Sequence, residues 1–135
     1  MTLHVELVSP EQILLSVDAD RVIARTLGGG DIAFLTDHAP FIGALDIWPL
    51  EILRSDGTVD VAAVHGGFIS VTDNQVKILS DLAELASDID MDRARAALAT
   101  AEAALPSGDE AKGSPEAAAV ARAQARLSAA GAAPA

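Results

Sequence analysis

The sequence predicts a β-sandwich of about ten strands followed by a hairpin of two α-helices. This prediction is based on a change in amino-acid composition near Ser87. Residues 1–87 contain 22 Val, Ile or Thr residues and residues 88–135 contain three, whereas Ala supplies 19 of the last 48 residues. β-Branched side chains suit a pleated sheet, and Ala has the highest helix propensity. We therefore expect a β domain over residues 1–87 and a helical domain over residues 88–135.

Short strand-like runs alternate with turn residues throughout the β domain. Asp56-Gly57 is the clearest hairpin signal, because this pair tolerates the positive φ angles of a tight turn. Many short strands with frequent turns indicate a sandwich or barrel, and about 85 residues can bury a core of their own. The expected strand-like runs are Leu3–Leu7, Arg21–Leu27, Ile32–Leu35, Leu50–Arg54, Val59–Val64, Phe68–Thr72 and Gln75–Leu79.

The helical domain is expected to contain helices over about residues 90–105 and 116–130. Asp90 or Asp88 offers an N-cap carboxylate, and Pro106 follows the first helix. The apolar positions that recur at helical spacing form a narrow seam made largely of Ala. Such a seam buries little apolar area, so we expect a weakly held hairpin that can dock, open or extend. The seam residues are Met91, Ala94, Leu98, Ala101 and Leu105 in the first helix and Val120, Ala123, Leu127 and Ala130 in the second.

Composition argues against several classes of function. The formal net charge is −11, which would repel a nucleic acid. The absence of Cys excludes disulfides, thiolate metal sites and thiol nucleophiles. No apolar run approaches the ~20 residues that cross a bilayer, and Met1–His4 lacks the features of a signal peptide. These features favour an acidic, soluble, cytoplasmic protein.

Local motifs for chemistry are weak when taken alone. Gly28-Gly29-Gly30 lacks the Lys and helix of a phosphate-binding loop, and the acidic run from Asp88 lacks the Gly and Glu of a calcium loop, so we expect no metal. His4, His38 and His65 lie in separate segments and are expected at the surface or in turns. Nothing resembles a catalytic constellation, which disfavours an enzyme acting alone.

Three arginines of the helical domain could bind phosphate. Arg122 and Arg126 lie four residues apart, and Arg93 follows Asp90 by three. At 100° per residue these side chains point away from the seam between the helices. Spacing alone therefore predicts a solvated face with local Asp–Arg pairs.

Taken together, segments along nearly the whole chain resemble the epsilon subunit of bacterial F-type ATP synthases. The order and spacing of these segments carry the resemblance more than any one of them. They are Val8-Ser9-Pro10-Glu11, Gly30-Asp31, Asp37-His38-Ala39-Pro40-Phe41, Gly66-Gly67-Phe68-Ile69-Ser70-Val71 and Val76-Lys77-Ile78-Leu79-Ser80-Asp81.

The resemblance implies a non-catalytic subunit of the central rotor, with one copy in each complex. It would bind the gamma subunit and rest on the c-ring at the cytoplasmic face of the bacterial cell membrane, with Asp31 and His38 as contact residues. It would couple proton-driven rotation to ATP synthesis on other chains. Its C-terminal helices would reach the alpha/beta ring and restrain ATP hydrolysis. The second helix is short and poor in basic residues, which weakens the expectation of inhibition.

One local motif implies a regulatory ligand. Ile89-Asp90-Met91-Asp92-Arg93-Ala94 is similar to the Ile/Leu-Asp-x-x-Arg-Ala pattern with which some bacterial epsilon subunits bind ATP in the folded hairpin. By the same resemblance Arg122 and Arg126 would assist, and Glu84 would supply a further contact. No cofactor is required by this interpretation, and ATP is the expected ligand.

Two departures and two other function classes bear on this interpretation. Ile32 is followed by Ala33 where the family usually has Gly, and Asp31 replaces the commoner Glu. A free-standing β-sandwich that binds proteins through a helical tail is the main alternative, and it would need exposed aromatic side chains. A small hydrolase is the third class, but it lacks a nucleophile–base motif.

Overall fold

The computed structural model describes residues 2–132, so Met1 and the last three residues of the expected domain 88–135 lie outside the described residues. It contains a seven-stranded sheet and two α-helices, with a short 3₁₀ turn before each helix. The strands are β1 (Leu3–Val8), β2 (Ile13–Thr26), β3 (Gly30–Leu35), β4 (Phe41–Arg54), β5 (Val59–Thr72), β6 (Gln75–Leu79) and β7 (Ala83–Leu85). The helical elements are η1 (Ala86–Asp88), α1 (Met91–Ala103), η2 (Gly108–Ala111) and α2 (Pro115–Ala132).

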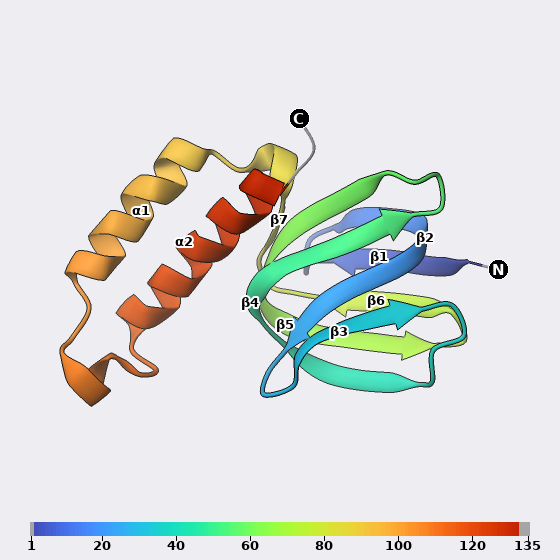
Figure 1. Cartoon of the computed structure of the whole chain (residues 1–135), viewed down its shortest axis with the longest axis horizontal. Coiled ribbons are helices and arrows are strands. Elements are labelled where there is room, and N and C mark those ends of the chain that lie inside the picture. Colours follow the sequence, from blue (N-terminus) through green and yellow to red (C-terminus); the bar gives the residue numbers. More distant parts are fainter. Residues whose placement is uncertain (1, 133–135) are drawn as a thin grey trace.

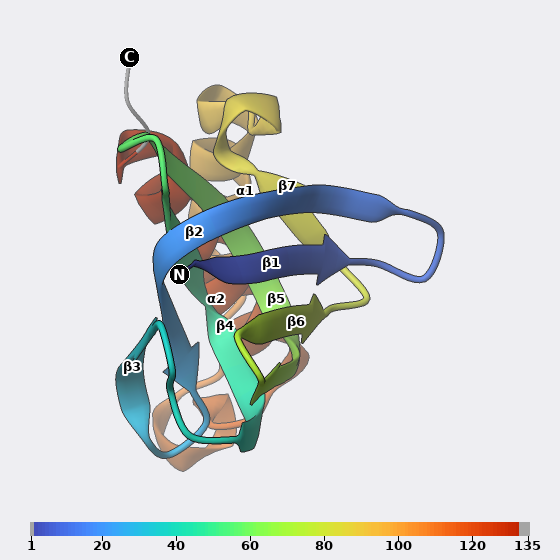
Figure 2. The same cartoon turned by 90° about the vertical axis from the view of Figure 1, so that its right-hand side faces the viewer.

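The sheet closes on itself around one core. The strand order is β1-β6-β5-β4-β2-β3, and β1 also pairs with β2, antiparallel, while it pairs with β6 in parallel. Figure 2 shows β1 between β2 and β6 on the side away from the helices. The alternating burial of β1 and β6 places every second side chain inside, as a two-layered β domain requires. The largest buried side chains include Phe34, Leu3, Leu7, Leu50, Ile52, Ile69 and Ile78.

The strand count is the main difference from the prediction of about ten. Three strands, β2, β4 and β5, are each 14 residues long. Two expected runs, Val59–Val64 and Phe68–Thr72, are halves of the continuous strand β5. The sandwich itself is confirmed.

A glycine pair bends β5 where two strands were expected. Gly66 and Gly67 have φ angles of 81° and 120°, which L side chains rarely adopt. A Cβ on Gly67 would lie 2.1 Å from the carbonyl oxygen of Leu79. The hydroxyl of Ser80, which is buried, lies within hydrogen-bond distance of the carbonyl oxygens of Gly66 and Leu82, at 2.8 and 2.9 Å. These contacts fix the start of the β6–β7 connection, and β7 then pairs with β5.

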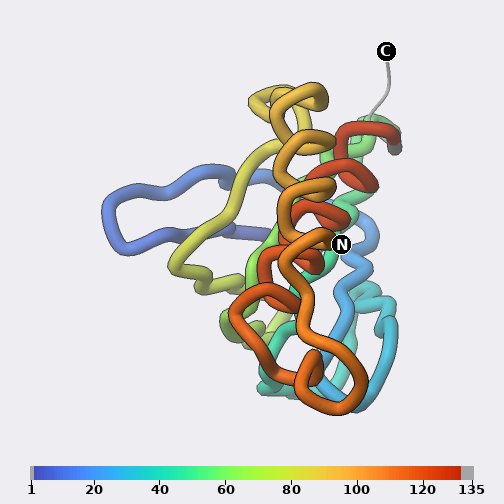
Figure 3. The backbone as a smooth tube through the Cα atoms, turned by 90° about the vertical axis from the view of Figure 1, so that its left-hand side faces the viewer, coloured from blue at the N-terminus to red at the C-terminus, as the bar shows by residue number. Residues whose placement is uncertain are grey.

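The helices form two further layers beside the sandwich. In Figure 1, α2 lies between α1 and the sheet, and Figure 3 shows α1 outermost. Helix α2 contacts β4 and β5 on one side and α1 on the other. Asp90 is the N-cap of α1, since its side chain accepts a hydrogen bond from the Arg93 amide.

The helix contacts depend mainly on alanine. Ala94 and Ala101 are the buried residues of α1, and Ala123 is buried in α2. A second buried face of α2, with Ala125 and Ala129, packs on Val61 and Ala63 of the sheet, and the sequence seam did not predict it. The larger expected seam residues are only half-buried (Met91, Leu98, Val120 and Leu127) or exposed (Leu105).

Candidate functional site

A pocket lies where the helical hairpin meets the sandwich. Its volume is about 330 Å³, within the range of small-molecule sites. Six of the seven residues expected to bind ATP line it, although they come from three separate elements and one loop. These six are Glu84, Ile89, Asp90, Arg93, Ala94 and Arg126, and Asp88 and Ala97 complete the lining.

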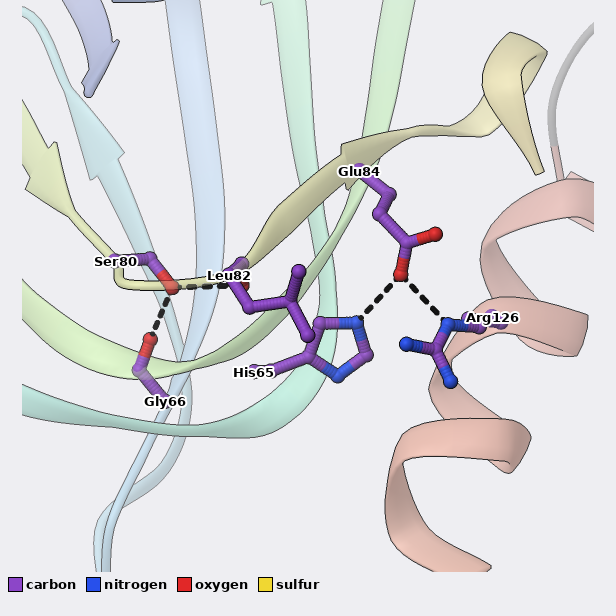
Figure 4. Close-up of polar contacts among 6 residues, drawn as sticks. All are labelled: His65, Gly66, Ser80, Leu82, Glu84 and Arg126. Atoms are coloured by element: carbon purple, nitrogen blue, oxygen red, sulfur yellow. Dashed lines mark hydrogen bonds and ion pairs between the residues drawn. The ribbon is translucent and has the colours of Figure 1, made fainter. Parts of the chain in front are cut away.

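Glu84 is the polar centre of this junction. It pairs with Ala63 across the β5–β7 ladder, and its side chain extends toward α2 (Figure 4). Its Oε1 atom accepts hydrogen bonds from Arg126 Nε at 2.6 Å and from His65 Nε2 at 3.0 Å. We call these three residues, His65, Glu84 and Arg126, the Glu84 joint. One carboxylate thus links β5, β7 and α2.

The ionisation of the joint follows from burial and from these contacts. Burial alone would raise the pKa of the Glu84 carboxyl, but the hydrogen bonds from Arg126 and His65 outweigh it and hold this pKa below its usual value. Burial lowers the pKa of His65; Glu84 opposes this shift, while the positive charges of Arg126 and Arg122 add to it. The joint therefore contains a carboxylate, a guanidinium and a neutral imidazole.

The beginning of α1 forms another part of the pocket wall. Asp90 accepts from the Arg93 amide through Oδ1 at 3.1 Å, and its backbone oxygen accepts from Ala94. This cap places Arg93 in the first turn of α1, at the positive end of the helix dipole. The pocket therefore combines two guanidinium groups with three carboxylates, those of Glu84, Asp88 and Asp90. Guanidinium groups can bind phosphate oxygens, and carboxylates can accept from amino or hydroxyl groups.

The expectation of a solvated arginine face is wrong for Arg126. Its side chain is 25 % exposed and pairs with Glu84. Arg126 instead lines the pocket between the sandwich and α1, together with Glu84 of β7 and Arg93 of α1. Arg122 is half-buried near His65 and does not line the pocket. The local Asp–Arg pair that does form joins Asp92 and Arg95, on the exposed side of α1.

The two residues expected to contact the c-ring or the gamma subunit lie at opposite ends of β3. Asp31 is its second residue and accepts two hydrogen bonds from Arg25, at 2.9 and 3.4 Å. The Arg25 guanidinium also stacks 3.9 Å above the ring of Trp48. His38 lies in the β3–β4 turn, where its ring packs edge-on against Phe34 with centroids 4.9 Å apart. The structure therefore does not bring Asp31 and His38 together.

The surroundings of two histidines could not be predicted from local sequence. His65 was expected at the surface or in a turn, but its side chain is only 2 % exposed because β7 and α2 cover it. His4 does lie on an exposed strand face, where Ser16 and Asp18 each contact its ring at 3.2 Å. Water competes for these contacts, and we assign them no chemistry. Neither arrangement has a spacing signal, since the partners are brought together by strand pairing.

Within residues 2–132, no helix is both long and apolar enough to span a bilayer. Over the same part of the chain, His, Asp and Glu side chains do not gather in a group of three that could ligate a metal ion.

Comparisons with known proteins agree with the fold and with the sequence resemblance. Residues 2–86 match the family model described as the beta-sandwich domain of the ATP synthase delta/epsilon chain. The ATP synthase epsilon chain of Thermobifida fusca is 46% identical over 134 residues, covering 95% of this chain and 91% of that protein. The epsilon chain of Streptomyces avermitilis is 48% identical over 101 residues, covering 75% of this chain and 81% of that protein.

A solved structure supports the same relationship. A chain of the Euglena gracilis mitochondrial ATP synthase, in an OSCP/F1/c-ring structure, superposes with a TM-score of 0.81 at 26% identity. The match covers 96% of this chain and 81% of that chain, so it includes the helical hairpin as well as the sandwich. The chain belongs to the ATP synthase delta/epsilon family and is an epsilon subunit of an F-type ATP synthase.

Proposed function

We propose that this subunit works in the central stalk, bound to the gamma subunit and resting on the c-ring, with one copy in each complex at the cytoplasmic face of the bacterial cell membrane. Family membership supports this role, as does the similarity to a chain from an F1/c-ring structure. The subunit would make no bond itself and would couple rotation to ATP synthesis on other chains. The family match favours this role over that of a free-standing protein-binding module.

The β3–β4 end of the sandwich is a suitable surface for the c-ring contact. His38 lies there between two exposed apolar side chains, Leu35 at 53% and Ile42 at 79%. Asp31 lies at the opposite end of β3, and its charge is already paired with Arg25. We propose His38 and Asp31 as two separate contact points on the neighbouring subunits.

We further propose that the hairpin restrains ATP hydrolysis by leaving the sandwich and reaching the alpha/beta ring. The contacts that hold it support such movement. Its fully buried side chains are alanines, such as Ala123, Ala125 and Ala129, and each buries little apolar surface. Two arrangements that differ by a few kcal/mol are what a switching element of this kind needs.

ATP is the proposed regulatory ligand of the docked hairpin. The observation that carries this proposal is the pocket, where Arg93 of α1, Arg126 of α2 and Glu84 of β7 meet beside the N-terminus of α1. The two guanidinium groups would bind phosphate oxygens, and the carboxylates would accept from the amino group or ribose hydroxyls. Because residues from both helices and the sandwich contribute, a bound nucleotide would stabilise docking.

Calorimetric titration of the full-length chain with ATP tests this proposal. Arg93→Ala should weaken binding by about ten-fold or more, because a charge-assisted contact is lost. Arg95→Ala is the matched control: Arg95 is two residues away and its side chain is 61% exposed, and it does not line the pocket. Equal weakening by both substitutions, or no binding by the unmodified chain, would contradict the nucleotide site.

A further inference from the structure

The His65 ring and the Arg126 side chain lie on two sides of the Glu84 carboxylate (Figure 4), and the side chain of His65 is almost completely buried. Because a carboxylate only accepts, the His65 Nε2 atom must carry the proton that it shares with Glu84 Oε1 at 3.0 Å. The other ring nitrogen, Nδ1, is buried and has no hydrogen-bond partner among the described residues. A second proton on His65 would therefore occupy a buried site without an acceptor.

The charged groups around His65 come from two elements and one loop. Glu84 reaches it from β7, and Arg122 and Arg126 act on it from α2. Asp81, in the β6–β7 connection, lines a second pocket together with His65. Protonation would thus add a positive charge beneath two guanidinium groups, of which only Arg126 is paired with Glu84.

We propose that neutral His65 is a positioning residue that holds Glu84 toward Arg126, and that protonation of His65 releases α2 from the sandwich. This inference goes beyond the proposed function, because it needs neither a nucleotide nor another subunit. It makes docking of the hairpin a proton-sensitive equilibrium within the chain itself.

The direction of the pH effect follows from the two states. In the docked state the pKa of His65 is held below its ordinary value of 6.5. When α2 leaves, the cover and both arginines leave with it, and the pKa rises. The released form then binds the proton more tightly, so docking is strongest above about pH 6.5 and weakens by up to about ten-fold per pH unit below it. Glu84 acts in the same direction, but only as the pH falls below its ordinary value of 4.5.

Pulsed electron paramagnetic resonance on the full-length chain can measure the docked fraction. The chain has no Cys, so spin labels can be placed at two exposed positions, Thr72→Cys in β5 and Gln124→Cys in α2. At pH 7.5 most molecules should show the distance between the two labels that is expected for the docked hairpin. At pH 5.5 a larger fraction should show longer distances. His65→Gln, whose amide can still donate to Glu84 but does not titrate, should remain docked at both pH values.

Two further variants distinguish the effect of His65 protonation from other effects of low pH. His4→Gln, at an exposed histidine on β1, should keep the pH response of the unmodified chain. His65→Leu, which cannot donate, should lower the docked fraction at pH 7.5. A docked fraction that does not change with pH, or one that still falls in His65→Gln, would overturn the proposal.

A second measurement remains decisive if the His65 variants fail to fold. The imidazole of His65 can be titrated by nuclear magnetic resonance in the unmodified chain and in Arg126→Gln. The proposal requires a higher pKa for His65 in Arg126→Gln, since one of the covering charges is removed. Equal pKa values in the two chains would contradict it.

Discussion

At the scale of single residues, Glu84 determines how the two domains meet. It is in the shortest strand, and its carboxylate accepts from one residue of the sandwich and one of the hairpin. The Glu84 side chain is 28% exposed, and the Arg126 side chain 25%. An ion pair at this degree of burial is screened less than a surface pair and is well oriented by two donors.

Glu84→Gln should therefore release the hairpin without unfolding the sandwich. The substitution removes the charge that pairs with Arg126 and should weaken docking by about 1 kcal/mol. Hydrogen exchange of the α2 amides would measure this as about five-fold faster exchange, with the core amides of β1 and β6 unchanged. Asp92→Asn is the control, because its ion pair with Arg95 is exposed and distant from the sandwich. Slower or unchanged exchange in Glu84→Gln would show that the joint does not hold the hairpin.

At the scale of elements, α2 has two buried faces rather than one. Ala123 lies on one, while Ala125 and Ala129 pack on the sheet beside Val61 and Ala63. The sequence pattern predicted the face toward α1, because only that face contains larger apolar residues such as Val120 and Leu127. Alanine carries no distinct signal of burial in an alanine-rich helix, and the second face was therefore missed.

Ala129→Leu should separate the hairpin from the sandwich. Ala129 is fully buried, so three added carbons have no space, and overpacking of this kind costs about 1–3 kcal/mol. Ala129 lies on α2 and its neighbours lie on the sheet. Because α2 can move away from the sheet, release of α2 relieves the strain. Limited proteolysis should cut the η2 region faster, whereas thermal unfolding of the sandwich should be unaffected. The same change at Ala99, which is exposed on α1, should alter neither measurement; an unchanged proteolysis rate for Ala129→Leu would contradict the packing account.

The strands, like the helices, were only partly predictable from sequence patterns. The alternating runs of β1 and β6 and the Asp56-Gly57 turn were predictable from local residues. The first half of β2 and most of β4 were not, since both strands bend and carry half-buried residues on both faces. Gly66-Gly67 looks like a break in the sequence, yet β5 continues through it because β4 pairs with the strand both before and after the glycines.

At the scale of the whole molecule, the sequence predicted the order of the domains, and six of the residues that it proposed as ATP ligands line one pocket. The six residues that meet at the pocket were named from a motif and a family resemblance, and the fold brings them together. The burial of His65 and the pairing of Arg126 with Glu84 depend on how the hairpin lies on the sandwich. Such contacts join positions 19 and 42 residues apart in the chain, and no local pattern encodes them.

The molecule as a whole combines a well-packed sandwich with a weakly held hairpin. The sandwich buries large side chains such as Phe34, Leu50 and Ile52, whereas the hairpin buries alanines and is fixed by one shared carboxylate. In the proposed role, this difference would allow the hairpin to change position while the sandwich stays bound to the neighbouring subunits. In the proposed role, ATP hydrolysis proceeds while the hairpin is docked, and the extended hairpin inhibits it.

ATP hydrolysis by the assembled synthase tests this claim most directly. A complex with the full-length chain should be compared with one whose chain ends after Ser87, over a range of ATP concentrations. The account predicts that truncation raises hydrolysis, with the greatest increase at low ATP, where the proposed nucleotide site would be empty and the hairpin free to extend. Equal rates at every ATP concentration would contradict it and leave the sandwich as the only functional part of the subunit.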